Sequence, residues 1–498
     1  MVIVTAKKEK KPRKEKETAP SFVLTLKLNT EKYQEDILDK RRDIGRRIYN
    51  ACLNELGKRY VLMTQSKKYQ GAINLPAKTE KEKRNQLLRE ISKKYKLTEY
   101  SMHKFVKPIQ HHYSKNIDAF TAQKIATRCL KAFKGQIYHT AKKVHFKKYG
   151  EMNSLEGKSN SAGIRFRGDI VYWNGLSIKV SINPKDEYAQ MALMLRIKYC
   201  RILRRGTKYY LQLIIEGIPP VKIDKETGEF RHKIGNSKVG LDIGPQTLGD
   251  VSDNEANLLE LAPEINTPYK EISRIQRKMD RSRRENNPGK YNSNGTINRN
   301  NKDKWIKSKN CLKLQHKLQK KQGKLKDIRR QSHNRLANEI ISQGIDVYVE
   351  TMSFKGLQKR AKKSTKNKNG KINSKKRFGK SLANKAPASF LTILDNKLKW
   401  QGAELHRIET AQVKASQYNH EEDVYIKKEL SERWTMIGAD RIQRDLYSAF
   451  LIMNVNPDLS TINREQCLEK YDKFKTLHNL EIARLRTSTN RRISSMGI

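Results

Sequence analysis

Three acidic residues at the ends of predicted regular elements constrain this chain more than any other feature. Asp242 ends a short apolar strand within residues 238–247 and runs into a glycine turn. Glu350 ends a second apolar strand, predicted over residues 345–350, and Asp445 opens a helical pattern over residues 444–450. Carboxylates that distant segments bring together can hold divalent cations. The pattern therefore predicts a metal site made of Asp242, Glu350 and Asp445.

Each acid alone has a simpler explanation, and two neighbours could substitute. An aspartate after a strand is more often a turn former or a helix cap. Asp440 lies five residues before Asp445, and Asp250 falls inside the next predicted strand, where it could be a fourth, outer ligand. The triad is favoured by the three features together. They are a strand that ends in an acid before a glycine turn, a second strand that ends in an acid, and an acid on an amphipathic helix.

The charge of the chain indicates a polyanionic partner. Lys and Arg total 105 against 52 acidic residues, a formal net charge of +53. Residues 261–340 hold 22 Lys/Arg and 7 Asp/Glu, and residues 351–380 hold 12 Lys/Arg and no acid. Because the excess of basic residues runs through the whole chain and is not confined to a tail, nucleic acid is the expected partner. The alternative is charge that only solubilises the protein.

Cysteines and hydropathy exclude several classes of protein. The five cysteines are widely spaced and form no Cys-x-x-Cys pair, so neither a disulfide framework nor a cysteine zinc site is expected, which fits a reducing compartment. No apolar run approaches 18 residues, so no membrane span is expected. Residues 1–16 are basic without an apolar stretch behind them, which predicts a disordered basic arm over residues 1–20 and not a secretory signal.

The first half of the chain predicts a small sheet interrupted by helices. Alternating residues 21–28 indicate a strand, and helical spacing follows to about residue 149. Strand patterns return at residues 163–175 and as a hairpin over 195–204 and 208–216. We therefore expect a β-barrel domain (residues 21–30 and 150–237) with a helical domain (31–149) inserted into it.

The second half predicts three short strands, a long helical stretch broken near residues 286–301, the strand ending in Glu350, a helix, a strand, a polar insert at 413–434 and the helix with Asp445. Acids on the first strand, the fourth strand and the last helix of this order are the ribonuclease-H-like layout. The predicted fold class is thus α+β and multidomain, with an RNase H-like domain over 238–412 and 435–498. Two divalent cations about 4 Å apart, held by shared carboxylates, can stabilise both oxygens in phosphodiester hydrolysis.

Three segments resemble the RuvC motifs of the TnpB family, the RNA-guided nucleases of insertion sequences and ancestors of compact type V CRISPR effectors. They are Gly-Leu-Asp-Ile-Gly at 240–244, Tyr-Val-Glu-Thr-Met-Ser-Phe-Lys-Gly-Leu at 348–357 and Gln-Arg-Asp-Leu-Tyr-Ser-Ala-Phe-Leu-Ile at 443–452. Residues 377–387 are also similar to a family segment. The resemblance covers roughly residues 120–455 and selects Asp445 over Asp440 as the third acid.

The resemblance implies an RNA-guided DNA endonuclease. A guide RNA from a transposon end or a CRISPR-like locus would pair with double-stranded target DNA beside a short flanking motif. The barrel would be the wedge domain and the helical domain the recognition domain, and the single RuvC site would cut both strands in turn with two Mg²⁺ ions, or Mn²⁺ in their place. The expected state is a monomer within a ribonucleoprotein in a prokaryotic cytoplasm, at the nucleoid and without a membrane partner.

One departure concerns zinc. Family members often carry a four-cysteine zinc ribbon between the second and third motifs, where this chain has residues 415–423 with no cysteine. His420 alone cannot hold zinc. We therefore expect a reduced insert at 413–434 without zinc.

Contacts to nucleic acid are expected from cations beside aromatic residues and from the segment after Glu350. Cations and rings together can hold phosphates and stack bases. The alternatives are that Phe133 and Phe146 belong to the core and that the cations are merely solvated or lie in a disordered loop. The predicted contacts are Lys131, Lys134, Lys142, Lys143, Lys147, Lys148, Lys359, Arg360, Lys362 and Lys363.

Three rival interpretations stay open. An actin-like ATPase also begins with an Asp-x-Gly turn, but it needs a duplicated fold and a second phosphate loop, and only one copy is visible. A guided DNA-binding repressor would keep the fold and lose cleavage, which the intact acidic triad argues against. A basic RNA-binding protein without enzymatic activity is the third.

Overall fold

The computed structural model describes residues 19–76, 79–224, 226–360, 364–365, 370, 372, 378–429, 432–488 and 496–498. The chain is an α+β protein that divides into two compact units, Met1–Val221 and Lys222–Ile498. Among the helices of the described residues, none combines the length and the apolar character that crossing a bilayer requires.

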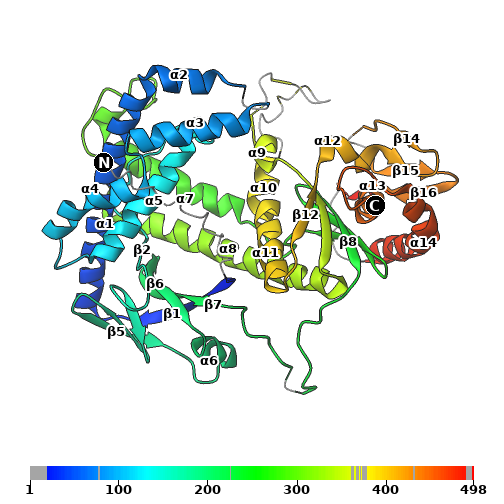
Figure 1. Cartoon of the computed structure of the whole chain (residues 1–498), viewed down its shortest axis with the longest axis horizontal. Helices are drawn as coiled ribbons and strands as arrows, with labels where there is room; N and C mark the ends of the chain where they lie inside the picture. Colours follow the sequence, from blue (N-terminus) through cyan, green and yellow to red (C-terminus); the bar gives the residue numbers. More distant parts are fainter. Residues whose placement is uncertain are drawn as a thin grey trace, which may run out of the picture. The chain divides into compact units, whose positions relative to one another are not determined.

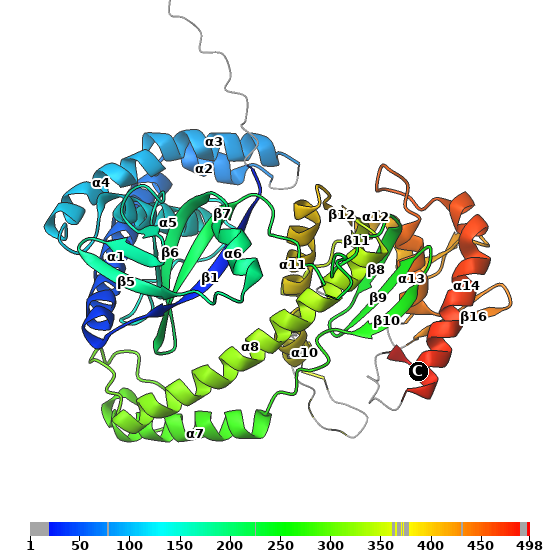
Figure 2. The same ribbon diagram turned by 90° about the horizontal axis from the view of Figure 1, so that it is seen from below.

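The first unit contains a curled antiparallel sheet of seven strands in the order β2-β6-β7-β1-β5-β4-β3 (Figure 2). The strands are β1 (Ser21–Asn29), β2 (Ser154–Glu156), β3 (Arg165–Arg167), β4 (Ile170–Trp173), β5 (Leu176–Ser181), β6 (Ile197–Arg205) and β7 (Lys208–Glu216). Alternate residues of β1 are buried, as their period of two requires. We predicted a small barrel, and the structure shows a curled antiparallel sheet; among the described strands, its edge strands β2 and β3 do not pair with each other.

The predicted helical insertion lies between β1 and β2, and Figure 1 shows α1, α4 and α5 packed together. Its helices are α1 (Lys32–Thr64), α2 (Lys67–Asn74), α3 (Lys81–Lys94), α4 (Glu99–His112) and α5 (Ala119–Ile137), and the short α6 (Glu187–Leu193) follows β5. Ile48, Leu56 and Leu130 are among the side chains buried in this block. The helices end at Ile137, so the last dozen residues of the predicted helical region are irregular.

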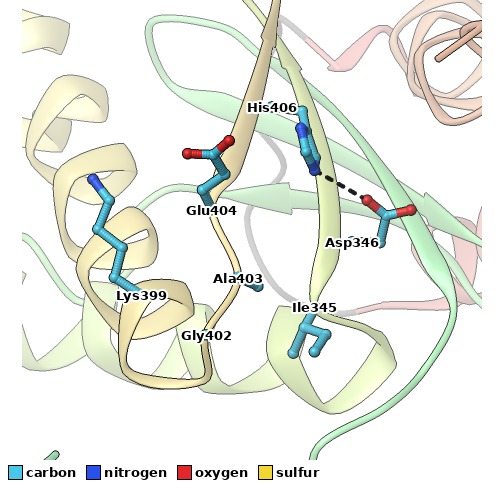
Figure 3. Close-up of a pocket in the computed structure, with 7 residues that line it drawn as sticks. All are labelled: Ile345, Asp346, Lys399, Gly402, Ala403, Glu404 and His406. Carbon is cyan, nitrogen blue, oxygen red and sulfur yellow. Dashed lines mark ion pairs between the residues drawn. The ribbon is translucent and has the colours of Figure 1, made fainter. Parts of the chain in front are cut away.

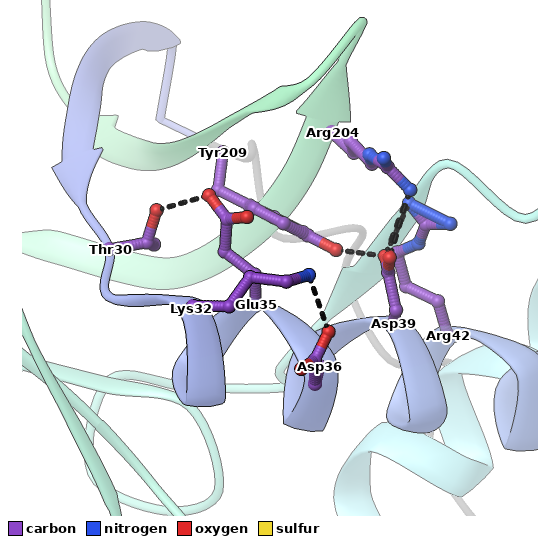
Figure 4. Close-up of polar contacts among 8 residues, drawn as sticks. All are labelled: Thr30, Lys32, Glu35, Asp36, Asp39, Arg42, Arg204 and Tyr209. Atoms are coloured by element: carbon purple, nitrogen blue, oxygen red, sulfur yellow. Dashed lines mark hydrogen bonds and ion pairs between the residues drawn. The ribbon is translucent and has the colours of Figure 1, made fainter.

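A cluster of polar contacts joins the start of α1 to the sheet of the same unit (Figure 4). Asp39 on α1 accepts hydrogen bonds from the Tyr209 hydroxyl and from Arg204 Nη1, the latter at 3.0 Å to each oxygen. Arg42 Nη1 lies 3.3 Å from the same carboxylate. Because the Asp39 carboxylate accepts hydrogen bonds from β6 and β7 and forms an ion pair with Arg42 of α1, the cluster fixes how the inserted helices leave the sheet.

The second unit is built on a five-stranded mixed sheet in the order β10-β9-β8-β11-β12. Its strands are β8 (Lys238–Ile243), β9 (Thr247–Ser252), β10 (Ala256–Glu260), β11 (Asp346–Glu350) and β12 (Leu405–Ile408). Strands β8, β11 and β12 are parallel, whereas β9 is antiparallel to both its neighbours. The first three predicted strands are β8, β9 and β10, which are antiparallel neighbours in sequence order. The fourth and fifth predicted strands, β11 and β12, continue the sheet on the other side of β8.

Helices cover both faces of this sheet, so most residues of its parallel strands β8 and β11 are buried. Helices α8 (Lys309–Gln343) and α11 (Pro387–Trp400) bury Leu336, Ile340 and Phe390 against one face. Helices α13 (Arg444–Met453) and α14 (Arg464–Thr487) cover the other, and Figure 2 shows these two layers on either side of β8–β10. All ten residues of α13 are buried, so this helix lies in the interior of the unit.

The second unit also contains further helices, two 3₁₀ turns and two small hairpins. The predicted break in the long helical stretch is observed, because α7 (Tyr269–Glu285) and α8 are separate helices, with the 3₁₀ turn η1 (Pro288–Lys290) between them. The short helices are α9 (Phe354–Leu357), α10 (Gly379–Lys385) and α12 (Thr410–Val413), and η2 (Ala415–Gln417) is a second 3₁₀ turn. The polar insert at 413–434 contains one small hairpin, β13 (Tyr418–Asn419) with β14 (Val424–Tyr425), and a second hairpin, β15 (Trp434–Ile437) with β16 (Asp440–Gln443), begins at its end.

Candidate functional site

Asp242 and Glu350 end neighbouring parallel strands. Leu241 of β8 is in register with Val349 of β11, so the next residue on each strand, Asp242 and Glu350, follows side by side. Leu241 and Val349 belong to the core on the α8 and α11 face. Because side chains alternate along a strand, both carboxylates lie on the opposite face, which α13 covers.

Asp445 reaches the same place from the first turn of α13. Gly249 is paired with Asp242 in the β8–β9 ladder, and a Cβ atom on Gly249 would lie 2.7 Å from the backbone oxygen of Asp445. Gly240 makes an even closer approach, since a Cβ there would lie 2.0 Å from the backbone oxygen of Ala449. The two glycines thus let α13 pack directly on the sheet, and this packing carries Asp445 to Asp242.

The three carboxyl groups share one electrostatic environment. Burial raises the pKa of Asp242 well above its ordinary value, and the charges of Asp445 and Glu350 raise it further. Burial raises the pKa of Glu350 to about 7, against opposing hydrogen bonds from the Ala415 backbone and the Thr410 side chain. Burial also raises the pKa of Asp445. A site where three acids resist ionisation together is one that a cation stabilises.

Two arginines that the sequence analysis did not single out as functional residues contact Asp445. Arg433 Nη1 lies 3.6 Å and Arg444 Nε 3.9 Å from Asp445 Oδ1, and both arginines lower the pKa of that carboxyl. Arg444 Nη1 also donates to the Glu429 carbonyl at 3.0 Å, whereas Arg433 remains more exposed. The Asp445 carboxylate is therefore partly neutralised by the protein itself.

The donor set fits a hard divalent cation. Carboxylate oxygens are the ligands that Mg²⁺ and Mn²⁺ prefer. Glu350 is 9% exposed, and its buried Oε1 has no hydrogen-bond partner among the described residues, which marks an acceptor directed into the site without a donor. Within the same residues no three His, Cys, Asp or Glu side chains already stand at metal-coordinating spacing, so binding requires the carboxylates to draw closer.

Neither substitute acid belongs to this cluster. Asp250 is in register with Leu241 and so lies on the opposite face of the sheet, where its Oδ2 accepts from Gln343 Nε2 at 2.8 Å. Asp440 pairs with Lys475 at 2.6 Å. The outer-ligand role considered for Asp250 is therefore wrong, because strand alternation turns its side chain away from Asp242.

The insert around His420 has a core of rings. His420 is 1% exposed, and its Nδ1 is hydrogen-bonded to the Tyr447 hydroxyl at 2.8 Å. Its ring lies 4.8 Å from that of Tyr471 and 6.0 Å from that of Phe450. The side chains of this segment therefore do not fit a four-cysteine zinc ribbon like that of the TnpB family.

The residues predicted to contact nucleic acid differ in their exposure. Lys131, Lys134, Lys142, Lys143, Lys148, Lys359 and Arg360 are exposed, and Lys362 and Lys363 lie outside the described residues. Lys147 is half-buried with its Nζ 4.8 Å from the centre of the Tyr49 ring, so it packs within the helical block. Phe133 is a core residue, as the alternative held, whereas Phe146 is 56% exposed.

A shallow hollow lies at the other end of the parallel strands (Figure 3). Its volume is about 610 Å³, and it is lined by residues at the start of β11 and β12, where His406 Nε2 lies 3.2 Å from Asp346 Oδ1. Asp346 begins β11 and Glu350 ends it, so the hollow is separate from the acidic cluster.

No protein-family model matches this chain, and no curated protein matches it either.

Proposed function

We propose that the second unit hydrolyses phosphodiester bonds with divalent cations held by Asp242, Glu350 and Asp445. The observation that carries the proposal is the shared environment of three acids from β8, β11 and α13, segments separated by about a hundred residues each, in which the pKa of Asp242 is raised by both partners. Such convergence is hard to explain by stability, because buried like charges destabilise a fold.

The fold of the unit supports an RNase H-like, RuvC-type domain. Its sheet order places the first strand in the centre, with the second antiparallel to it and the fourth beside it. The acids lie on β8 and β11, the first and fourth strands of the unit, and on α13, the helix that the sequence pattern predicted at Asp445. Together with the three RuvC-like motifs, this arrangement favours a nuclease of the TnpB kind over the actin-like alternative, since the sheet occurs once in the described residues.

The chain's own residues have separate tasks in this mechanism. Bound Mg²⁺ would activate water and stabilise the leaving oxygen. Asp242 and Glu350, side by side on adjacent strands, would provide oxygen ligands, and Asp445 would add a third from a helix start. Glu350 must lose its proton to act as a ligand, and its pKa of about 7 leaves this proton easily displaced at neutral pH.

We further propose that the activity is RNA-guided cleavage of DNA. The +53 net charge supports a large nucleic-acid partner, and the resemblance of the motif segments to the TnpB family supports a guide RNA as that partner. A guide would supply sequence specificity by base pairing while the protein holds the backbone.

The test uses the ribonucleoprotein purified from its host, with the bound RNA sequenced to define a matching supercoiled plasmid. We expect Mg²⁺-dependent cleavage of the matching plasmid alone. Asp242→Ala should abolish cleavage while guided binding persists, and Asp440→Ala, a matched loss of an acid paired with Lys475, should keep cleavage. If the wild type binds the matching plasmid and never cuts it, the repressor interpretation replaces this proposal.

A further inference from the structure

The loop that joins α7 to α8 is long and polar, yet it has a defined conformation. It comprises the 23 residues from 286 to 308, of which seven are asparagine. Figure 2 shows α7 and α8 side by side, with this loop at their end away from strands β8–β10. Loops of this length without regular structure are usually either functional or disordered. What fixes this one therefore bears on what it does.

A buried ammonium group organises the centre of the loop. Lys290 is only 5% exposed, and its Nζ donates to the backbone oxygens of Asn301, at 3.0 Å, and of Asp303. The same Nζ lies 5.7 Å from the centre of the Trp305 ring. Because burying a charge is costly unless it is well bonded, this lysine holds the far side of the loop in one place.

Two further side chains fasten the loop to the end of α7. Asn287 donates from Nδ2 to the Ile306 carbonyl at 2.8 Å and accepts from the Ile306 N–H at 2.7 Å. Arg284 donates to the Gly295 carbonyl at 3.1 Å and covers the Tyr291 ring at 4.6 Å. These bonds hold the loop in one conformation, so the outward surface is presented on a rigid support.

The outward surface combines three basic side chains with apolar ones, and Lys302 Nζ donates to the Arg299 carbonyl at 2.9 Å. Arg299, Lys302 and Lys304 are exposed, and none of them has an acidic partner in the described part of the chain. Beside them Trp305 is 40% and Ile306 62% exposed. Unpaired cations next to an accessible ring are the chemistry that binds phosphates and stacks unpaired bases.

We infer that the α7–α8 loop is a binding site for single-stranded nucleic acid, with the three cations on the backbone and Trp305 against a base. A duplex would offer phosphates but no free base face, so the exposed ring favours a single strand. An acidic protein is the alternative partner. It could form ion pairs with the three cations, but it would give Trp305 and Ile306 no role in binding. The inference does not depend on cleavage, because it concerns binding at a separate site.

The test measures binding by the full-length protein, freed of bound nucleic acid, to labelled oligo-uridine, oligo-thymidine and a DNA duplex of about 20 nucleotides each. The variant carries Arg299→Gln, Lys302→Gln and Lys304→Gln. The matched control carries Lys81→Gln, Lys93→Gln and Lys94→Gln, which remove the same charge from exposed positions of α3. Thermal unfolding of both variants checks that each remains folded.

We expect the loop variant to bind single strands about tenfold more weakly, with a salt slope smaller by about 2, since each lost phosphate contact removes about 0.7 for single strands. The control should stay within about twofold of the wild type. A preference for uridine or thymidine would separate RNA from DNA as the natural ligand, and either supports the site. Equal losses in both variants, or a loss confined to the duplex, would overturn it.

A second measurement needs no substitution. Photo-crosslinking of the unmodified protein to a single-stranded oligonucleotide, followed by peptide mapping, should place crosslinks within residues 297–307. Crosslinks found only outside this stretch would contradict the inference even if the variants misfolded.

Discussion

Glu350→Gln should stabilise the cation-free protein and inactivate it. The pKa of Glu350 is raised from 4.5 to about 7, chiefly by burial, so the ionised side chain opposes folding. With 1.36 kcal/mol per pKa unit, the cost is about 3 kcal/mol at pH 8 and about 1 kcal/mol at pH 5, which lies only about half a unit above the ordinary pKa of 4.5. Glutamine has nearly the same shape and cannot ionise, so it removes this cost.

The sign of the pH dependence follows from the raised pKa. Between about pH 4.5 and 7 the folded protein binds more protons at Glu350 than the unfolded chain does, so the contribution of this group to stability falls as pH rises through that window. The variant's advantage should therefore be large at pH 8 and small at pH 5.

The assay is thermal unfolding at both pH values in a chelator and again with Mg²⁺. At pH 8 without metal, we expect the variant's Tm to exceed that of the wild type by several degrees, at roughly 2–4 °C per kcal/mol. Mg²⁺ should raise the Tm of the wild type and leave that of the variant nearly unchanged. Glu339→Gln, at an exposed position on α8, is the control and should change neither value. A variant that is less stable than the wild type at pH 8 would refute the reasoning.

Three further outcomes are expected. Arg433→Gln should strengthen Mn²⁺ binding to the free protein by up to about fivefold, because Arg433, 3.6 Å from Asp445, no longer competes with the metal ion for that carboxylate. Paramagnetic resonance measures the free Mn²⁺, and unchanged or weaker binding would count against this competition. Gly240→Ala should cost the second unit about 3 kcal/mol or more in chemical denaturation, because its Cβ would lie 2.0 Å from a backbone oxygen, whereas Gly323→Ala, with nothing within 4 Å, should be neutral or stabilising. Nucleic-acid affinity of the wild type should fall steeply with salt, and a flat profile would contradict the electrostatic basis of binding.

The sequence was sufficient to predict the acidic strand ends. Apolar runs that stop at Asp242 and Glu350 predicted two strands, and both were observed; that they pair in parallel, with the two acids side by side, came from the structure. The helix that begins at Asp445 was also predicted, but its position on the sheet depends on Gly240 and Gly249, whose close approach to α13 is a matter of packing rather than of pattern.

Other features depend on contacts that one-dimensional patterns do not contain. Arg433 belongs to a polar segment, and it reaches Asp445 only because its carbonyl accepts from the Arg444 N–H at 2.9 Å at the base of the β15–β16 hairpin. The long helix α14 was not predicted, since its buried face includes polar side chains such as Glu481, which accepts from the Leu258 N–H at 2.9 Å. Asp250 was misjudged because a strand's register, and not its composition, decides which face an acid occupies.

The central claim is that Asp242, Glu350 and Asp445 together bind divalent cations. An anomalous difference map from crystals of the protein grown with Mn²⁺ tests it most directly. We predict peaks within coordinating distance of all three carboxylates, with Arg433 displaced from Asp445. Peaks only elsewhere, or a bound ion that leaves one of the three acids uncoordinated and facing away, would contradict the claim.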